Sequence, residues 1–307
     1  APSPTTPAGC ASAVTLDATN VFYTLHANKF YRAEVEAAAA AISDSSLAAA
    51  AKVADVGTFL WLDTIANIGK LEPALDVPCD QILGLVIYDL PGRDCAAKAS
   101  NGELAVGELD RYKTEYIDPI VAILKYPNTA IALVIEPDSL PNLKPGAELA
   151  KVYKAAGSPK QVRGIATNVA GWNAWDLSPG EFSASDAKYN KCQNEKLYIF
   201  GPLKSAGMPN HAIVDTGRNG VTGLREEWGW CNVNGAGFGV RPTATGELAD
   251  AFVWVKPGGE SDGTSDSSAT RYDSFCGKSD AYKPSPEAGQ WNQAYFEMLL
   301  KNAKPAF

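Results

Sequence analysis

The sequence predicts an α/β fold in which parallel strands alternate with helices, and three observations support this. Short apolar runs recur along the chain. Segments with helical composition or spacing lie between several of these runs. The 307 residues suit an α/β barrel, which commonly forms a single domain at this length. We expect one domain whose sheet closes into a barrel, although periodicity alone does not separate a barrel from an open sheet.

Six apolar, β-rich runs carry the strand prediction. They are Gly57–Asp63, Ile82–Leu90, Ile131–Leu140, Arg163–Val169, His211–Gly217 and Ala251–Gly258. Helices are predicted from Ala-rich composition or from apolar residues at helical spacing, as in the series Tyr112, Tyr116, Ile120 and Leu124. The predicted helices are Lys29–Ser43, Leu47–Val56, Glu108–Tyr126, Ala147–Ala156 and Trp291–Asn302.

The charge of the chain restricts its partners. The formal net charge is −8, and no basic run occurs anywhere in the sequence. Such a surface is a poor match for nucleic acid or for an anionic membrane. No apolar stretch approaches the roughly 18 residues of a membrane span. A neutral or cationic partner is more compatible with this charge, and we expect a monomer.

Cysteine usage and the first residues suggest an oxidising compartment. Six cysteines form an even count without a Cys-x-x-Cys pair, and only two histidines accompany them, which argues against zinc. Disulfides fit better, and Cys79 with Cys95 is one pairing among several. Residues 1–15 form a Pro/Thr/Ser-rich tail that resembles the stump of a linker to an upstream carbohydrate-binding module. We therefore expect a secreted, extracellular protein.

Carboxylates follow the predicted strands, where α/β folds keep their chemistry. They are Asp63, Asp89, Asp94, Glu136, Asp138, Asp215, Glu260 and Asp262, and tryptophans lie near many of them. The chain contains no nucleophile elbow, dinucleotide fingerprint or phosphate loop. Glycoside hydrolysis typically uses paired carboxylates beside aromatic side chains. One carboxylic acid protonates the leaving-group oxygen, and a second carboxylate activates water or stabilises the positively charged sugar.

The motifs resemble those of glycoside hydrolase family 6, the fungal cellulases. They are Tyr-Asp-Leu-Pro-x-Arg-Asp-Cys from Tyr88, Ile-Glu-Pro-Asp-Ser-Leu from Ile135, Ala-Thr-Asn-Val-Ala from Ala166 and Trp-Val-Lys-Pro-Gly-Gly-Glu from Trp254. The resemblance runs from about Phe30 to Phe307. It implies a distorted, TIM-like parallel β/α barrel with fewer than eight strands, forming a catalytic domain over residues 16–307. It also implies hydrolysis of β-1,4-glucosidic bonds with inversion, without any metal or organic cofactor.

The resemblance also implies roles for individual residues. Asp138 would be the general acid, with its pKa raised by burial or by a nearby carboxylate such as Asp94. Asp262 matches the candidate base, and a water relay towards Asp94 and Ser100 is the competing account. Arg93 would orient Asp94. Substrate contacts are implied for Tyr88, Arg93, Ser100, Trp61, Asp63, Asn168, Trp230, Lys256 and Glu260, and a disulfide for Cys231 with Cys276.

The chain departs from the family pattern after residue 143. Leu140–Leu143 runs almost directly into Lys144–Glu148, which resembles a helix that normally follows one further strand. About one βα unit, on the order of 30 residues or more, is therefore missing. Either the printed sequence is incomplete or the protein carries a natural deletion.

Three functions remain open at this point. The loop after Asn101–Glu103 is short, which favours cleavage of internal bonds in cellulose and related β-glucans by an endo-1,4-β-glucanase. A cellobiohydrolase that acts from chain ends is the alternative within the family. A glucan-binding protein without turnover is the alternative of another class, if the missing segment is a real deletion.

Overall fold

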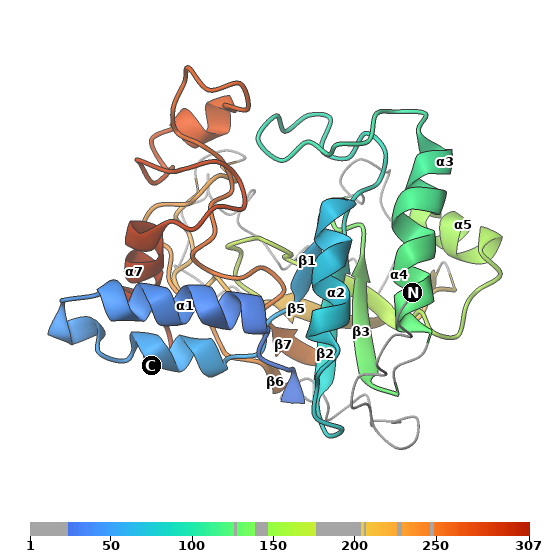
Figure 1. Cartoon of the computed structure of the whole chain (residues 1–307), viewed down its shortest axis with the longest axis horizontal. Helices are drawn as coiled ribbons and strands as arrows, with labels where there is room; N and C mark the ends of the chain where they lie inside the picture. Colours follow the sequence, from blue (N-terminus) through green and yellow to red (C-terminus); the bar gives the residue numbers. More distant parts are fainter. Residues whose placement is uncertain are drawn as a thin grey trace, which may run out of the picture.

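The computed structural model describes residues 24–125, 128–138, 147–175, 204–205, 207–225, 229–245 and 249–307. Its strands fall into two sheets, one in the order β1-β2-β3 and the other in the order β4-β5-β7-β6. Figure 1 shows the strands of the first sheet beside the helices α2 (Leu71–Ala74) and α4 (Asp118–Leu124). The predicted tail of residues 1–15 lies outside the described residues.

The first sheet is parallel throughout. It contains β1 (Leu60–Leu62), β2 (Ile82–Ile87) and β3 (Ala130–Ile135). The pairing register aligns the last residues of all three strands in one row. The segments that leave these strands therefore begin side by side, and they carry the predicted carboxylates.

The second sheet is mixed. Strands β4 (Gly164–Thr167), β5 (His211–Asp215) and β7 (Ala251–Val253) run parallel to one another. The short strand β6 (Thr243–Ala244) pairs antiparallel with β7. All six predicted strand regions thus contain a strand, and each observed strand is shorter than its apolar run.

Two of the predicted helical segments differ from the prediction, and the short helices at Ala66–Lys70, Leu71–Ala74 and Ser274–Gly277 were not predicted. The α-helices are α1 (Lys29–Ala41), α2 (Leu71–Ala74), α3 (Leu109–Arg111), α4 (Asp118–Leu124), α5 (Ala147–Ala155) and α7 (Gln293–Lys301). The remaining helical segments are η2 (Ser45–Leu47), η3 (Ala50–Asp55), η4 (Ala66–Lys70), η5 (Tyr112–Ile117) and η8 (Ser274–Gly277).

The first difference concerns the predicted helix Leu47–Val56, which forms the two 3₁₀ turns η2 and η3 instead. A helix of about ten residues depends on tertiary packing more than on composition. The Ala-rich composition of this segment therefore does not ensure an α-helix. The second concerns Glu108–Tyr126, in which a π-helical segment, η5, separates α3 from α4.

Three apolar clusters hold the fold together. One lies between the two sheets and includes Phe59, Val86, Val134 and Val253. A second packs β1 and β2 against α2 and the η5–α4 segment. A third joins α1 to α7.

Among the described residues, a backbone hydrogen bond connects the two sheets at one side. The backbone N–H of Phe59, just before β1, donates to the carbonyl of Trp254, just after β7, at 3.2 Å. On the other side, no strand among the described residues lies between β3 and β4. The described strands therefore form an incomplete ring, and the predicted closed barrel is not confirmed. No helix in the described part of the chain is both long and apolar enough to cross a membrane.

Candidate active site

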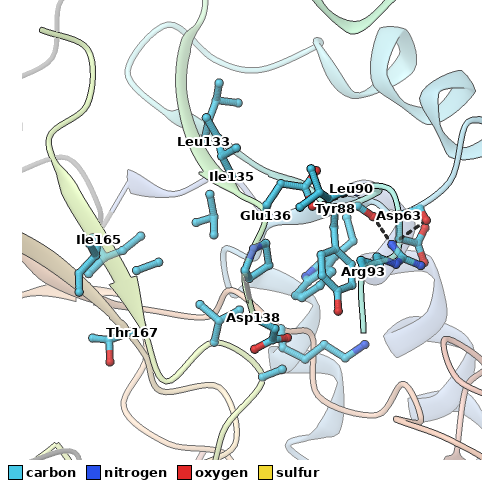
Figure 2. A pocket seen from close by; sticks show the side chains of 18 of the residues that line it. Asp63, Tyr88, Leu90, Arg93, Leu133, Ile135, Glu136, Asp138, Ile165 and Thr167 are labelled. Atoms are coloured by element: carbon cyan, nitrogen blue, oxygen red, sulfur yellow. Dashed lines mark hydrogen bonds between the residues drawn. The ribbon is translucent and has the colours of Figure 1, made fainter. Parts of the chain in front are cut away.

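A large cavity opens where the strands of both sheets end. Its volume is about 2520 Å³. All twelve predicted catalytic and substrate-contacting residues line it. Figure 2 shows Asp138 in the middle of this cavity, with Tyr88, Arg93 and Asp63 on one side and Ile165 and Thr167 on the other.

Asp138 has the electrostatics of a general acid. Desolvation of its carboxyl by the protein atoms around it raises the pKa to about 7, and the negative charges of Asp94 and Asp262 act in the same direction. The residue keeps an exposed surface because it faces the open cavity, so a substrate can reach it. The positive charge of Arg218 and a hydrogen bond with Tyr88 lower the pKa of Asp138 in part. An acid with a pKa near 7 is protonated at mildly acidic pH.

Tyr88 connects this acid to Asp94. The Tyr88 hydroxyl donates to Asp94 Oδ2. Burial and the charges of Asp138 and Asp94 raise the pKa of the hydroxyl far above its usual value, so Tyr88 remains a donor. The hydrogen bond thereby holds the Asp94 carboxyl in place near Asp138.

Arg93 reaches Asp94 through Tyr88 and not through a direct ion pair. Its Nη1 donates to the carbonyl of Asp63 at 2.9 Å and to the carbonyl of Tyr88. Its guanidinium carbon lies 4.2 Å from the centre of the Tyr88 ring. Arg93 therefore holds the ring that in turn holds Asp94. Its Nε is buried without a hydrogen-bond acceptor.

Asp262 forms an ion pair that sequence reasoning missed. Arg218 Nη1 lies 2.9 Å from Oδ1 and 2.8 Å from Oδ2 of Asp262. The backbone N–H of Asn232 donates to Oδ2 at 2.9 Å. Arg218 also packs over Trp172, with 4.1 Å between its guanidinium carbon and the ring centre. Both carboxylate oxygens of Asp262 are therefore occupied by protein donors.

The predicted disulfide between Cys231 and Cys276 is confirmed, and it brackets the Asp262 loop. Cys79 is also disulfide-bonded. Cys95 is free and exposed, so the suggested pairing of Cys79 with Cys95 is wrong.

The predicted sugar-binding residues form two groups on the cavity wall. Trp61 anchors its ring through Nε1, which donates to the carbonyl of Val255 at 2.8 Å. Lys256 Nζ lies 5.4 Å from the centre of that ring and 3.1 Å from Glu260 Oε2. On another part of the wall, Trp230 packs against Phe275 with ring centres 5.8 Å apart.

A further carboxyl, Glu34 of α1, lies near the Lys256–Glu260 pair. Burial and the negative charge of Glu260 raise the pKa of Glu34 to about 7, although Lys70 and Lys256 lower it. Sequence reasoning did not single out Glu34, because this residue belongs to a helix far from any strand end.

The backbone is strained at four residues in and around the site. Asp94, Glu136, Asp138 and Asn168 have φ angles of 49°, 47°, 67° and 55°, in the left-handed region that non-glycine residues rarely adopt. Each follows the C-terminal end of a strand. Such strain persists where the surrounding structure enforces it, and it clusters at functional sites.

Several predicted carboxylates and amides serve the fold. Glu136 accepts hydrogen bonds from the N–H groups of Asp89 and Leu90 and, at 2.7 Å, from the Tyr112 hydroxyl, so it joins the ends of β2 and β3. Asn168 donates to the carbonyl of Asp215 at 2.8 Å.

Comparison with known proteins identifies the family. The profile of "Glycosyl hydrolases family 6" matches residues 21–147 and 141–303 of this chain. The chain belongs to this family. A relative named 1,4-beta-D-glucan cellobiohydrolase CEL6C, from Podospora anserina, is 66% identical to this chain. The alignment of the two sequences is 378 residues long and covers 100% of this chain and 95% of that protein. A putative endoglucanase type B from Fusarium oxysporum is 44% identical, over 92% of this chain and 76% of that protein.

Solved structures of family 6 enzymes agree with the fold. The cellobiohydrolase II (Cel6A) from Humicola insolens, in complex with glucose and cellotetraose, superposes with a TM-score of 0.86. It is 39% identical, and the match covers 95% of this chain and all of that one. The α/β architecture of the chain is therefore that of a family 6 catalytic domain.

Proposed function

We propose that the chain hydrolyses β-1,4-glucosidic bonds of cellulose with inversion, releasing short products from chain ends. The observation that carries this proposal is the placement of Asp138 beside the Tyr88–Asp94 pair in a cavity lined by Trp61 and Trp230, where desolvation raises the pKa of Asp138 to about 7. An acid with a raised pKa beside a second carboxyl allows the two groups to divide acid and electrostatic roles between them.

In the proposed reaction, Asp138 donates its proton to the glycosidic oxygen while a water molecule attacks the anomeric carbon from the opposite face of the sugar. The charge of Asp94 stabilises the oxocarbenium-like transition state. Inversion also needs a base for the attacking water. The occupied oxygens of Asp262 favour the relay towards Asp94 and Ser100 over direct proton transfer to Asp262. The assignment of Asp262 as base stays a prediction.

The side chains on the cavity wall fit a glucan chain. Trp61 and Trp230 offer ring faces on which glucosyl units stack. Lys256 and Glu260 form an ion pair that can donate to and accept from sugar hydroxyls. These side chains would hold the glucan chain without taking part in the reaction. Substitution of any of them should therefore weaken substrate binding more than it slows the chemical step.

Attack at chain ends is favoured over the internal cleavage expected from the sequence. The Podospora relative is named a cellobiohydrolase. The loop at Lys98–Asn101 is tied to a second loop, since the Lys98 N–H donates to Asp273 Oδ2 at 2.9 Å and Arg271 Nη2 donates to the Ala99 carbonyl at 2.6 Å. Loops that hold one another beside the cleft restrict entry by the interior of a glucan chain.

The test compares Asp138→Asn with Asp110→Asn, a matched change of an exposed carboxylate on α3. We expect Asp138→Asn to abolish hydrolysis of phosphoric-acid-swollen cellulose while cellotetraose still binds. Asp110→Asn should retain both properties. A parent protein that binds cellotetraose without hydrolysing cellulose would instead establish the glucan-binding function.

The mode of attack needs its own measurement. A chain-end enzyme releases mainly soluble sugar and lowers the viscosity of carboxymethylcellulose only slowly. A rapid fall in viscosity at low sugar release would restore the endoglucanase assignment.

A further inference from the structure

Two tyrosines reach the ends of the first sheet from a π-helical turn. The segment η5 has the wider hydrogen-bond spacing of a π-helix, which is rare in proteins and frequent at functional sites. Tyr112 and Tyr116 of this segment stack on one another, with their ring centres 5.5 Å apart. Neither tyrosine lines the cavity, so any role that they have in the reaction is indirect.

Tyr116 joins β1 to β2 at the point where the pairing of these strands stops. Its hydroxyl accepts a hydrogen bond from the backbone N–H of Tyr88 at 2.9 Å and donates to the carbonyl of Leu62. Leu62 is the last residue of β1, and Tyr88 directly follows β2. Tyr116 is fully buried, and burial raises the pKa of its hydroxyl far above the usual value, so the hydroxyl remains protonated. This hydroxyl therefore fixes the backbone from which the Tyr88 side chain extends.

Tyr112 makes the corresponding link between β2 and β3. Its hydroxyl donates to Glu136 Oε1 at 2.7 Å. The Glu136 carboxylate also accepts from the backbone N–H groups of Asp89 and Leu90, which follow β2. Glu136 directly follows β3 and has a left-handed backbone conformation, shortly before Asp138. Such a conformation persists only where its surroundings enforce it, and the Tyr112 hydroxyl is one of the groups that hold the Glu136 side chain.

Both links act on the residue that connects the two catalytic carboxyls. The Tyr88 hydroxyl donates to Asp94 and forms a hydrogen bond with Asp138. The ring of Trp61 and the guanidinium of Arg93 pack against the Tyr88 ring, with 5.2 Å between the ring centres and 4.2 Å from the guanidinium carbon to the Tyr88 ring centre. A ring confined in this way moves with its backbone, so a displacement at the Tyr88 N–H also displaces the hydroxyl.

We propose that Tyr112 and Tyr116 are positioning residues that act through the Tyr88 hydroxyl and hold Asp94 and Asp138 in the geometry that the reaction requires. The π-helical turn brings both tyrosine hydroxyls to the strand ends at once, one at the junction of β1 with β2 and the other at the junction of β2 with β3. This role rests on the hydrolysis proposed above.

The first test combines kinetics with a double-mutant cycle. Tyr116→Phe removes one hydroxyl and keeps the buried ring. We expect kcat on cellotetraose to fall about tenfold to a hundredfold, which is the cost of a small misplacement of catalytic groups, while KM changes less than about twofold. In a Tyr88→Phe background the same substitution should have almost no further effect, because the hydroxyl through which Tyr116 acts is then absent.

The matched control is Thr114→Val, which removes a hydroxyl from an exposed position of the same π-helical turn. The Thr114 hydroxyl donates to the carbonyl of Asp110 at 2.9 Å. This variant should keep the kcat of the parent. An unchanged kcat in Tyr116→Phe, or a loss that recurs undiminished in the Tyr88→Phe background, would overturn the proposal.

Tyr112→Phe covers the case in which Tyr116→Phe does not fold. Tyr112 is only partly buried, and Glu136 keeps its two backbone donors in this variant. We expect kcat to fall about threefold to tenfold, as for the loss of one hydrogen bond, and this fall should also disappear in the Tyr88→Phe background. A kcat equal to that of the parent would contradict the role of Tyr112.

A measurement without turnover separates this role from the proposed function. Infrared titration follows the Asp138 carboxyl, whose ionised form is stabilised by the hydrogen bond with Tyr88. We expect the titration midpoint to move to higher pH in Tyr116→Phe and in Tyr112→Phe, since neither substitution alters a charge. These shifts in a protein that hydrolyses no cellulose would support the positioning role and refute the proposed reaction. Unchanged titration in both variants would overturn the positioning role, even in an active enzyme.

Discussion

One nitrogen of Arg218, Nη1, contacts both carboxylate oxygens of Asp262, at 2.9 and 2.8 Å. The Arg218 side chain is 1% exposed and that of Asp262 is 11% exposed. The pair joins the segment after β5 to the long loop after β7. A guanidinium buried to this extent needs its counter-ion, which makes the pair a structural requirement as well as part of the active-site wall.

Replacing Asp262 by Ala should therefore destabilise the protein strongly. The change leaves the Arg218 charge buried and unpaired, for which we expect a loss of about 3–5 kcal/mol in the free energy of unfolding. Urea unfolding followed by tryptophan fluorescence measures this loss. Asp110→Ala, at an exposed position, should change stability by less than about 0.5 kcal/mol. An Asp262→Ala protein as stable as the parent would show that the pair does not hold the loop.

The rate of hydrolysis should fall as the pH rises through about 7, because Asp138 must be protonated to act as the acid. Asp94→Asn removes a negative charge that raises the Asp138 pKa, so the pKa should fall while burial keeps it above its ordinary value. Infrared titration of the Asp138 carboxyl can follow this shift even in a slow variant. A rate that stays flat from about pH 4 to 9 would contradict the assignment of Asp138.

Stability should also decrease over the same pH range. Burial raises the pKa of Asp89 to about 7, and both of its carboxyl oxygens are buried without partners. Its neutral form is favoured in the native state, so its contribution is fully present below about pH 4 and is lost as the pH rises through about 7. Asp89→Asn cannot ionise. Its Tm should therefore fall less than that of the parent between pH 4 and 8, whereas Asp76→Asn, at an exposed position, should follow the parent.

Removing the disulfide at Cys276 should loosen the loop that carries Asp262. The bond closes a loop with a sequence separation of 45 residues, for which chain entropy gives about 4 kcal/mol. We expect Cys276→Ser to lower the free energy of unfolding by about 2–5 kcal/mol. Cys95→Ser, at the free and exposed cysteine, is the matched control and should be close to neutral. Equal stability of the two variants would argue against a structural role for the bond.

The positions of the strands could be predicted from the sequence because they depend on local pattern. Apolar runs marked all six strand regions, since strands of a mainly parallel sheet are apolar along their length. The same runs drew attention to the carboxylates that follow them, and the resemblance to family 6 singled out Asp138 among these carboxylates as the candidate acid.

Partners distant in sequence could not be predicted. Arg218 lies 44 residues from Asp262, and no local pattern indicates which carboxylate it pairs with. Glu34 belongs to an amphipathic helix, where a glutamate is normally solvated. Arg93 was assigned to the adjacent Asp94, but strand-end geometry directs its guanidinium to backbone carbonyls instead. The direction in which a side chain points is set by the tertiary structure, which sequence spacing does not encode.

The connection between the two sheets has a consequence for substrate binding. Asp138 and Asp94 extend from the first sheet, whereas Arg218, Asp262 and Lys256 extend from the second. Among the described residues, the link from Trp61 to the Val255 carbonyl and the link from Phe59 to Trp254 join the two sheets at one side. A glucan chain that contacts both Asp138 and Lys256 spans the two sheets, so a bound substrate adds contacts between the walls that carry the acid and the Lys256–Glu260 pair.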